Sequence, residues 1–373
     1  MPKEFDCRIP IYKMPKEKIL LIDNVFAPSK KDRILNGVQK FSKAQREVLS
    51  EYYDVYYVTM KGSDLQFPNQ IILDYIQDVN LTVNEKRQIT KTIANEIRRL
   101  IKELQPSIIL DNSCKHMSSI FKHYKNGVVF DHYHRPSMPL TKEVKNKFVK
   151  NKVYWCGVSN WQNEQFNFLF DGVASVHLVE KEEQVMNAKP YGMFVGRWDS
   201  GKKPHIMLNM HAKNVPDVTL HIFTTLKHCY IKERDLKHID DLKKHKNIQF
   251  HFDAPREEIL NYMREAQFIL GSGKESTGIV SMEGATFGVP YVVLGSDKVA
   301  EEEHMHPFAM TLINRKDSIS AKEQYKNAIE KYKTYTLEDR KRIAKYAYIK
   351  YNKTQFLIRQ LRLINDVKAK YAL

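Results

Sequence analysis

Residues 271–296 read GSGKESTGIVSMEGATFGVPYVVLGS, and this stretch decides the fold. The apolar run Phe268–Leu270 enters it as a strand, and a loop of glycine, serine and threonine comes next. The apolar residues that follow the loop recur at the three-residue spacing of a helix face: Ile279, Met282 and Ala285. Gly288 ends that helix, and Pro290 precedes a second apolar strand. The stretch therefore predicts a strand, a loop, a helix and another strand.

Two glutamates stand eight residues apart in this unit, Glu275 in the loop and Glu283 inside the helix. The backbone N–H groups of Thr277 and Gly278 point out of the helix start, where the helix dipole favours an anion such as a diphosphate. Carboxylates at such a turn are the usual acceptors for sugar and ribose hydroxyls. The unit therefore offers groups for an anion and for hydroxyls.

This pattern resembles the Glu-x7-Glu signature of retaining glycosyltransferases of the family-4 type, which have the GT-B fold. The resemblance extends upstream to Phe194–Lys202, FVGRWDSGK, where those enzymes have a strand ending in Gly-Arg and then a loop with a lysine. It implies that Arg197 and Lys202 hold the diphosphate of the donor beside Gly196. The usual glycine after the lysine is Lys203 here, so Lys202 and Lys203 remain alternatives. Solvated loop charges are the other interpretation of these cations.

The same resemblance assigns the rest of the donor site. It implies that Glu283 holds the ribose hydroxyls, that Glu275 holds the hydroxyls of the donor sugar, and that Asp253 lies near the nucleobase. The donor is a nucleotide diphosphate sugar, with UDP as the expected carrier, and no metal or other cofactor is required. The resemblance leaves open whether the enzyme is a hexosyl- or a pentosyltransferase.

The chain has 373 residues, enough for two domains that each bury a core. Strands alternate with helices, which predicts an α/β fold with parallel sheets covered on both faces. The resemblance implies that this fold is GT-B, with two Rossmann-like domains and a cleft between them. We expect an acceptor domain over 1–180, a linker over 181–190 and a donor domain over 191–345. The resemblance implies that a C-terminal helix over 346–373 crosses back to the first domain.

The expected strands of both domains are apolar runs between turn signals. They are Lys18–Asp23, Val55–Thr59, Ser107–Asp111, Val128–Phe130, Val153–Val158 and Val173–Val179, then Val218–Phe223, Ile248–Phe252, Phe268–Gly271 and Tyr291–Leu294. A capping box predicts a helix start at Thr82–Glu85, and three helical segments are expected from about Ile319 to Tyr371. Scattered cysteines, the lack of a secretory segment and the lack of a membrane-spanning run favour a cytoplasmic protein.

The loop expected after Phe130 contains His132 and His134. A histidine at this place in family-4-like enzymes commonly faces the donor sugar, and the His-x-His form resembles the phage enzymes that glucosylate hydroxymethylcytosine in DNA. Metal binding is an alternative for two histidines at this spacing, but no third ligand stands nearby. His134 is equally well explained as a structural residue.

The chain has a second metal-like cluster and one departure from the family pattern. Glu303, His304 and His306 form another metal-like cluster, for which a solvated loop is the better interpretation. The loop Asn24–Ser29 lacks the glycine pair that family-4-like enzymes have after the first strand. The acceptor contacts of the family therefore cannot be transferred to this chain.

The formal net charge is +16, and two segments contain all of the excess. Residues 115–152 have nine Lys or Arg against two Asp or Glu, and residues 340–373 have ten against one. If the C-terminal helix crosses back, the two segments meet near the acceptor site and favour a polyanion. Coding bias and solvated lysine-rich helix faces are the alternative explanation.

The charge favours a polyanion, and the resemblance to the phage enzymes implies that the acceptor is duplex DNA with a hydroxymethylated cytosine base flipped out of the stack. Candidate contacts to DNA are Arg135, Lys145, Lys147 and Lys150, with Phe121, Tyr124 and Tyr133 available for stacking. A cell-envelope or capsular enzyme that contacts an acidic membrane and a lipid-linked glycan is an alternative. A basic nucleic-acid-binding protein on an inactive GT-B scaffold is another, although such a protein has no need for a diphosphate-sugar site.

Overall fold

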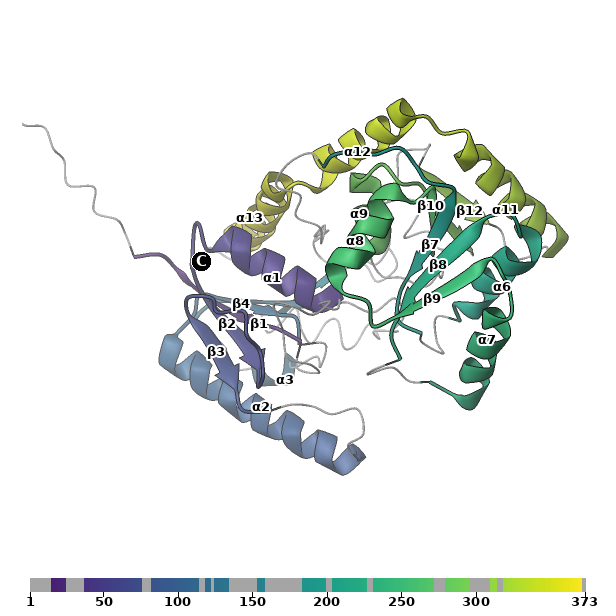
Figure 1. The fold of residues 1–373 in the computed structure, drawn as a ribbon. Helices are drawn as coiled ribbons and strands as arrows, with labels where there is room; N and C mark the ends of the chain where they lie inside the picture. Colours follow the sequence, from purple (N-terminus) through teal and green to yellow (C-terminus); the bar gives the residue numbers. More distant parts are fainter. Residues whose placement is uncertain are drawn as a thin grey trace, which may run out of the picture.

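The computed structural model describes residues 15–24, 37–75, 82–113, 118–121, 124–133, 153–157, 183–198, 203–226, 231–271, 279–294, 309–313 and 318–370. Two six-stranded sheets, parallel in every pairing, form the frame (Figure 1). Their strand orders are β3-β2-β1-β4-β5-β6 and β12-β11-β10-β7-β8-β9. Counted from its own first strand, each sheet therefore has the order 3-2-1-4-5-6 of a Rossmann-like domain. The predicted α/β fold of the GT-B type is confirmed.

The first sheet and its helices come from the amino-terminal part of the chain. Its strands are β1 (Lys18–Ile22), β2 (Asp54–Met60), β3 (Gln70–Leu73), β4 (Ile108–Asp111), β5 (Val128–Tyr133) and β6 (Val153–Gly157). The described helices of this part are α1 (Gly37–Leu49), α2 (Val83–Leu104) and α3 (Ser118–Phe121). Thr82 caps α2 with the reciprocal hydrogen bonds of a capping box to Glu85, as the sequence predicts.

The second sheet begins at Tyr191, after residues 183–190, which form neither helix nor strand. Its strands are β7 (Tyr191–Val195), β8 (Thr219–Thr224), β9 (Ile248–Phe252), β10 (Phe268–Gly271), β11 (Tyr291–Leu294) and β12 (Met310–Ile313). The described helices of this part are α6 (His205–Asn214), α7 (Glu233–Lys243), α8 (Arg256–Glu265), α9 (Ile279–Thr286), α11 (Ser318–Lys333), α12 (Leu337–Tyr351) and α13 (Lys353–Lys370).

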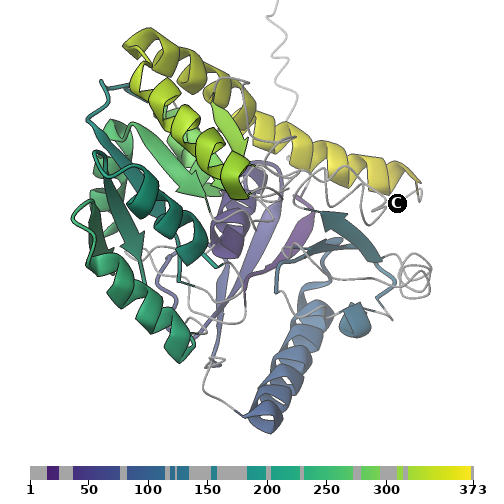
Figure 2. The ribbon, with the colours of Figure 1, turned by 90° about the vertical axis from the view of Figure 1, so that its right-hand side faces the viewer.

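The last helix, α13, lies on the first sheet although it ends the chain. Its buried residues Phe356, Leu363, Ile364 and Val367 share one apolar cluster with residues of α1, β1, β4, β5 and β6. Helix α2 covers the opposite face of that sheet through a separate cluster. Figures 1 and 2 show α13 and α1 on one side of the first sheet and α2 on the other. The carboxyl-terminal helix thus joins the two halves of the molecule.

The predicted strands in the described residues are present, and the three helices expected near the carboxyl terminus are confirmed as α11, α12 and α13. The sequence analysis missed β3 and β12, the four-residue strands at one edge of each sheet. The predicted strand Val173–Val179 lies outside the described residues. The end of β5 also differs from expectation, because the strand continues to Tyr133.

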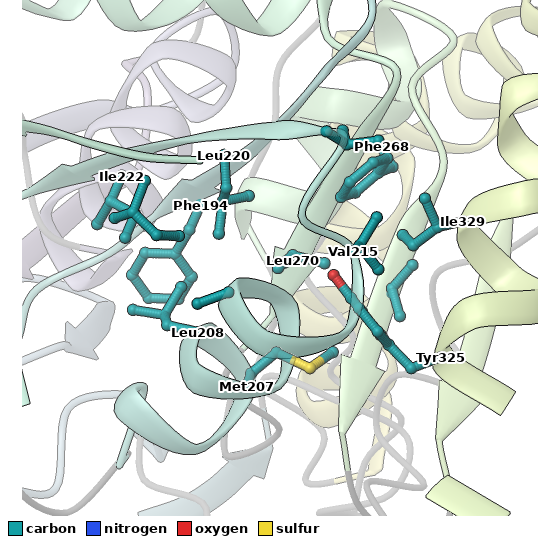
Figure 3. Packing of buried hydrophobic residues seen from close by; sticks show 14 of the residues in the cluster. Phe194, Met207, Leu208, Val215, Leu220, Ile222, Phe268, Leu270, Tyr325 and Ile329 are labelled. Atoms are coloured by element: carbon teal, nitrogen blue, oxygen red, sulfur yellow. The ribbon is translucent and has the colours of Figure 1, made fainter. Parts of the chain in front are cut away.

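A buried histidine lies inside the core of the second sheet. Tyr325 from α11 lies beside Val215 and Ile329 in that core (Figure 3). The hydroxyl of Tyr325 is 2.6 Å from Nδ1 of His211, whose Nε2 is 2.8 Å from the carbonyl oxygen of Val218. Burial lowers the pKa of His211 to about 4. This imidazole is therefore neutral at neutral pH.

Lowering the pH from 6.5 toward 4 is expected to destabilise the fold. The unfolded chain binds a proton at His211 near pH 6.5, whereas the folded protein resists protonation until about pH 4. The contribution of neutral His211 to the free energy of unfolding is fully present above pH 6.5. It is lost as the pH falls toward 4, by roughly 2–3 kcal/mol. Urea unfolding at pH 7.5, 6.5, 5.5 and 4.5 measures the slope. The slope should become shallower in His211→Gln, and an equal slope in both proteins would contradict the assignment.

Gly288 and Arg340 hold α9 against α12. Gly288 has a φ of +73°, and a Cβ added there would lie 2.3 Å from the carbonyl oxygen of Arg340. The guanidinium of Arg340 donates to the carbonyl oxygens of Ala266 and Arg264, each at 2.7 Å, and to that of Phe287 at 3.4 Å. These carbonyls lie at the ends of α8 and α9, so one buried arginine satisfies groups that the helices cannot bond internally.

Replacing Arg340 by methionine is expected to lower the free energy of unfolding by about 2–3 kcal/mol. The methionine fills similar space but leaves buried carbonyl groups without their donor. Arg342→Met is the matched control, because Arg342 lies on the same helix with a side chain that is 70% exposed. Equal midpoints of urea unfolding for the two variants would show that the Arg340 contacts do not stabilise the fold.

Candidate functional site

In a sheet of this order, ligands bind at the carboxyl ends of the two strands where the strand order reverses. In the second sheet these strands are β7 and β10. Gly196 and Arg197 directly follow β7, and residues 272–278, which contain Glu275, directly follow β10. The two motifs that the sequence analysis joined by resemblance therefore leave neighbouring strands at the switch point of one sheet.

Glu283 lies in α9, the helix after β10, with a side chain that is 2% exposed. Its Oε1 accepts from Nη2 of Arg256 at 2.6 Å, and its Oε2 accepts from Nη1 of the same residue at 3.3 Å. Arg256 is the first residue of α8. The planar guanidinium thus donates to both carboxylate oxygens, an arrangement that fixes the plane of the carboxylate.

A second cation reaches Glu283 from the other half of the chain. Nζ of Lys40, on α1, donates to Oε1 of Glu283 at 2.6 Å across 243 positions of sequence. Burial lowers the pKa of Lys40, while the charge of Glu283 opposes that shift and Arg256 adds to it. The ammonium is therefore stabilised at this place by the carboxylate it contacts. Glu283 is the point where α1 of the first half meets α9 of the second.

Residues 196–198, which follow β7, run along the neighbouring strand β8, and Lys203 and Pro204 precede α6. The N–H of Gly196 donates to the carbonyl of Phe223 at 3.0 Å, and Arg197 is exposed, so its guanidinium faces solvent. Lys203 has a φ of +50°, the left-handed conformation that favours glycine. The family pattern has glycine at the position after its lysine. The backbone of Lys203 therefore has the conformation that a glycine at that position would readily adopt.

Asp253 lies at the carboxyl end of β9 with a φ of +54°. Its Oδ1 accepts from the hydroxyl of Thr225 at 2.6 Å, and its N–H donates to the carbonyl of Thr224 at 3.0 Å. The strained turn is therefore tied to the end of β8. Asp253 lies on the same edge of the sheet as Arg197.

His132 was expected in a loop, and that expectation is wrong. It lies in β5, is 1% exposed, and its ring centroid is 5.2 Å from that of Phe41 on α1. The strand continues because Asp131 and His132 pair in register with β6. Burial lowers the pKa of His132 to about 3. At neutral pH His132 is therefore a neutral hydrogen-bonding group under α1 and not an exposed general acid.

His132 belongs to a buried polar network that joins three parts of the chain. Nε2 of Gln45, on α1, is 3.3 Å from Nε2 of His132 and donates to Oε1 of Gln360, on α13, at 2.8 Å. Nδ2 of Asn112 donates to Oε1 of Gln45 at 2.7 Å. The network lies at the carboxyl ends of β4 and β5, where it ties both helices to the sheet.

Some candidate residues lie outside the described part of the chain. They are His134, Arg135, Lys145, Lys147, Lys150, Lys202, Glu275, Thr277, Gly278, Glu303, His304 and His306. Among the residues that the structure describes, no group of three or more His, Cys, Asp or Glu is placed to hold a metal ion. Within the same residues, no helix is long and apolar enough to cross a membrane.

Sequence reasoning missed Lys40 and Arg256, two cationic partners of Glu283 in the described part of the chain. Lys40 sits in the helix GVQKFSKAQREVL, where it looks like one more lysine beside an apolar stripe. Arg256 follows Pro255 at a helix start and carries no motif. Their contact with Glu283 depends on tertiary structure alone, so no spacing in the sequence indicates it.

The family model of glycosyl transferases group 1 matches residues 179–350, which contain all of the second sheet. A comparison with curated proteins gives no match. Sequence similarity to the group 1 glycosyltransferases is therefore found in this part of the chain.

Solved structures are similar over nearly the whole chain. Sucrose-phosphate synthase from Thermosynechococcus elongatus has 11% identity and a TM-score of 0.68, over 95% of this chain and 100% of that chain. The pneumococcal O-GlcNAc transferase GtfA, solved with UDP and GlcNAc, has 12% identity and a TM-score of 0.67, over 94% and 99%. AviGT4 from avilamycin A biosynthesis has 13% identity and a TM-score of 0.61, over 95% and 98%. At these identities the likeness shows the fold.

Proposed function

We propose that this chain, in which residues 179–350 match the group 1 glycosyltransferases, transfers a glycosyl group from a nucleotide diphosphate sugar to a hydroxyl with retention of anomeric configuration. The observation that carries the proposal is the position of Glu283. It is a buried, cation-held carboxylate on the helix that follows β10, eight residues after Glu275. This is where the Glu-x7-Glu pattern requires a ribose-binding carboxylate.

Each residue of the donor site has a distinct role in this proposal. Arg197 and Lys202 stabilise the departing diphosphate, and the N–H groups of Thr277 and Gly278 add to that stabilisation. Gly196 lets the backbone approach the donor, and Asp253 lies toward the nucleobase.

The sugar itself is held by other groups. Glu275 accepts hydrogen bonds from its hydroxyls. His132, as an uncharged imidazole, and His134 are the proposed hydrogen-bonding groups of the first half. The leaving diphosphate takes the proton of the acceptor hydroxyl, and no metal ion is required. UDP is the proposed nucleotide, which the presence of UDP with the similar GtfA structure supports.

A panel of nucleotide sugars tests the donor. Thermal stabilisation and sugar hydrolysis are measured with UDP-, GDP-, ADP- and dTDP-linked hexoses and pentoses. Stabilisation by one nucleotide class and release of its sugar with the α configuration preserved would support the proposal. Absence of both effects across the panel would overturn it.

For the acceptor, we propose hydroxymethylated cytosine in duplex DNA. The charge of the carboxyl-terminal segment supports this choice, because residues 340–365 contain eight Lys or Arg and no Asp or Glu. Helix α13, which carries part of that charge, shares its apolar cluster with β5 and β6, the strands on either side of basic residues 134–152. The proposed DNA contacts of Arg135, Lys145, Lys147 and Lys150 belong to this segment.

Transfer of labelled sugar to three acceptors tests the acceptor. These are hydroxymethylated duplex DNA, the same duplex with unmodified cytosine, and a lipid-linked saccharide in anionic vesicles. Label on the first alone supports the DNA proposal, and the triple change of Lys145, Lys147 and Lys150 to glutamine should flatten the salt dependence of DNA binding. Label on the saccharide alone would favour the envelope-glycan function. Binding of DNA without any transfer would favour a non-catalytic nucleic-acid-binding protein.

A further inference from the structure

The Glu283 carboxylate is held by cations from two separate elements. Arg256 contacts both oxygens, and Lys40 contacts Oε1 at the same 2.6 Å distance. The side chain of Glu283 is 2% exposed, and burying a carboxylate at that depth is costly unless cations compensate it. The positions of Arg256 and Lys40 therefore determine where the carboxylate lies.

We propose that Lys40 and Arg256 are positioning residues for the nucleotide ribose, and that Lys40 makes the donor site depend on both halves of the molecule. The inference rests on the proposed function, in which Glu283 accepts hydrogen bonds from the ribose hydroxyls. Neither cation touches the reacting atoms. Both act through the orientation of Glu283.

The two cations contribute differently because they differ in shape and origin. Arg256 is a planar fork from α8, in the same half as Glu283, and its paired contacts set the plane of the carboxylate. Lys40 is a single donor from α1, and that helix packs on the first sheet and on α13. Its contact requires α1 to lie beside α9. The carboxylate is thus fully oriented only in this arrangement of the two halves.

Binding of two nucleotides to two proteins tests the role of Lys40. The ligands are UDP and 2′,3′-dideoxy-UDP, which lacks both ribose hydroxyls, and the proteins are the wild type and Lys40→Met. Titration calorimetry should show that Lys40→Met binds UDP roughly tenfold more weakly, because Glu283 loses its orientation. Binding of the dideoxy compound should be unchanged, since it makes no contact with Glu283.

The controls separate positioning from a general effect on the fold. Lys43→Met removes a lysine from the same helix, where Lys43 is 40% exposed and pairs with Glu47, and it should bind both nucleotides as the wild type does. Lys40→Arg keeps a cationic donor and should recover part of the lost affinity. If Lys40→Met is poorly folded, Lys40→Gln and Arg256→Gln provide the same comparison of ligands.

The possible outcomes distinguish a failure of the role of Lys40 from a failure of the proposed function. Equal loss of affinity for both nucleotides would show a merely structural role and overturn the inference, as would full retention of UDP affinity in Lys40→Met. A wild type that binds UDP and the dideoxy compound equally would overturn both the ribose assignment of Glu283 and this inference. A wild type that binds neither compound, nor any other nucleotide of the donor panel, would overturn the proposed function itself.

Discussion

Replacing Arg197 or Lys202 by alanine is expected to slow sugar transfer by about 10²- to 10³-fold, which corresponds to roughly 3–4 kcal/mol in the transition state. In the proposed reaction the bond to the diphosphate breaks, so negative charge develops on the leaving group in the transition state. Arg197 is exposed at the end of β7, beside the switch point of the second sheet. Removing it should therefore lower kcat more than it raises the KM for the donor.

Lys203→Gly is the matched control for Lys202→Ala. Lys203 holds a positive φ that favours glycine, so Lys203→Gly should keep the activity and raise stability by roughly 1 kcal/mol. Steady-state kinetics and urea unfolding of Arg197→Ala, Lys202→Ala, Lys203→Gly and Lys203→Ala test these expectations. A silent Lys202→Ala beside an inactive Lys203→Ala would show that the loop register is wrong.

The fold was predictable from the sequence because its central strands are buried on both faces. Runs such as KILLI in β1 and ILG in β10 have the continuous apolar character of buried parallel strands. Strand β3 lacks that character, since only Leu73 of its four residues is buried. Edge strands of four residues depend on pairing with a neighbour, so their sequence contains little periodic signal.

Candidate site residues were predictable only where their motif lies in one continuous stretch of the sequence. Glu283 could be placed because strand, loop and helix are consecutive in sequence. The location of His132 was missed because the last residues of β5, Asp131–Tyr133, are polar or amphipathic and look like a loop in the sequence. Helices α1 and α13 cover this part of the sheet. Lys40 meets Glu283 across 243 positions, and a single sequence contains no local pattern for such a contact.

The last prediction concerns the two glutamates of the donor site. Glu283→Ala should weaken binding of every nucleotide sugar alike, by about 10- to 100-fold, because it removes the ribose acceptor that all donors share. It also leaves Lys40 and Arg256 facing each other without the carboxylate, so the free energy of unfolding should fall as well. Glu275→Ala should instead lower kcat and discriminate among sugars, since that carboxylate is assigned to sugar hydroxyls.

Calorimetry with nucleotide and nucleotide sugar, run beside urea unfolding, separates these effects. Glu257→Gln serves as the control, because it removes one exposed carboxylate from the first turn of α8, next to Arg256. Glu283→Gln keeps an oxygen acceptor, so it should bind nucleotide better than Glu283→Ala and still pair with Arg256 through that oxygen. Wild-type nucleotide affinity in a folded Glu283→Ala would remove Glu283 from the donor site and leave its cation cluster as a contact that only holds α1 against α9.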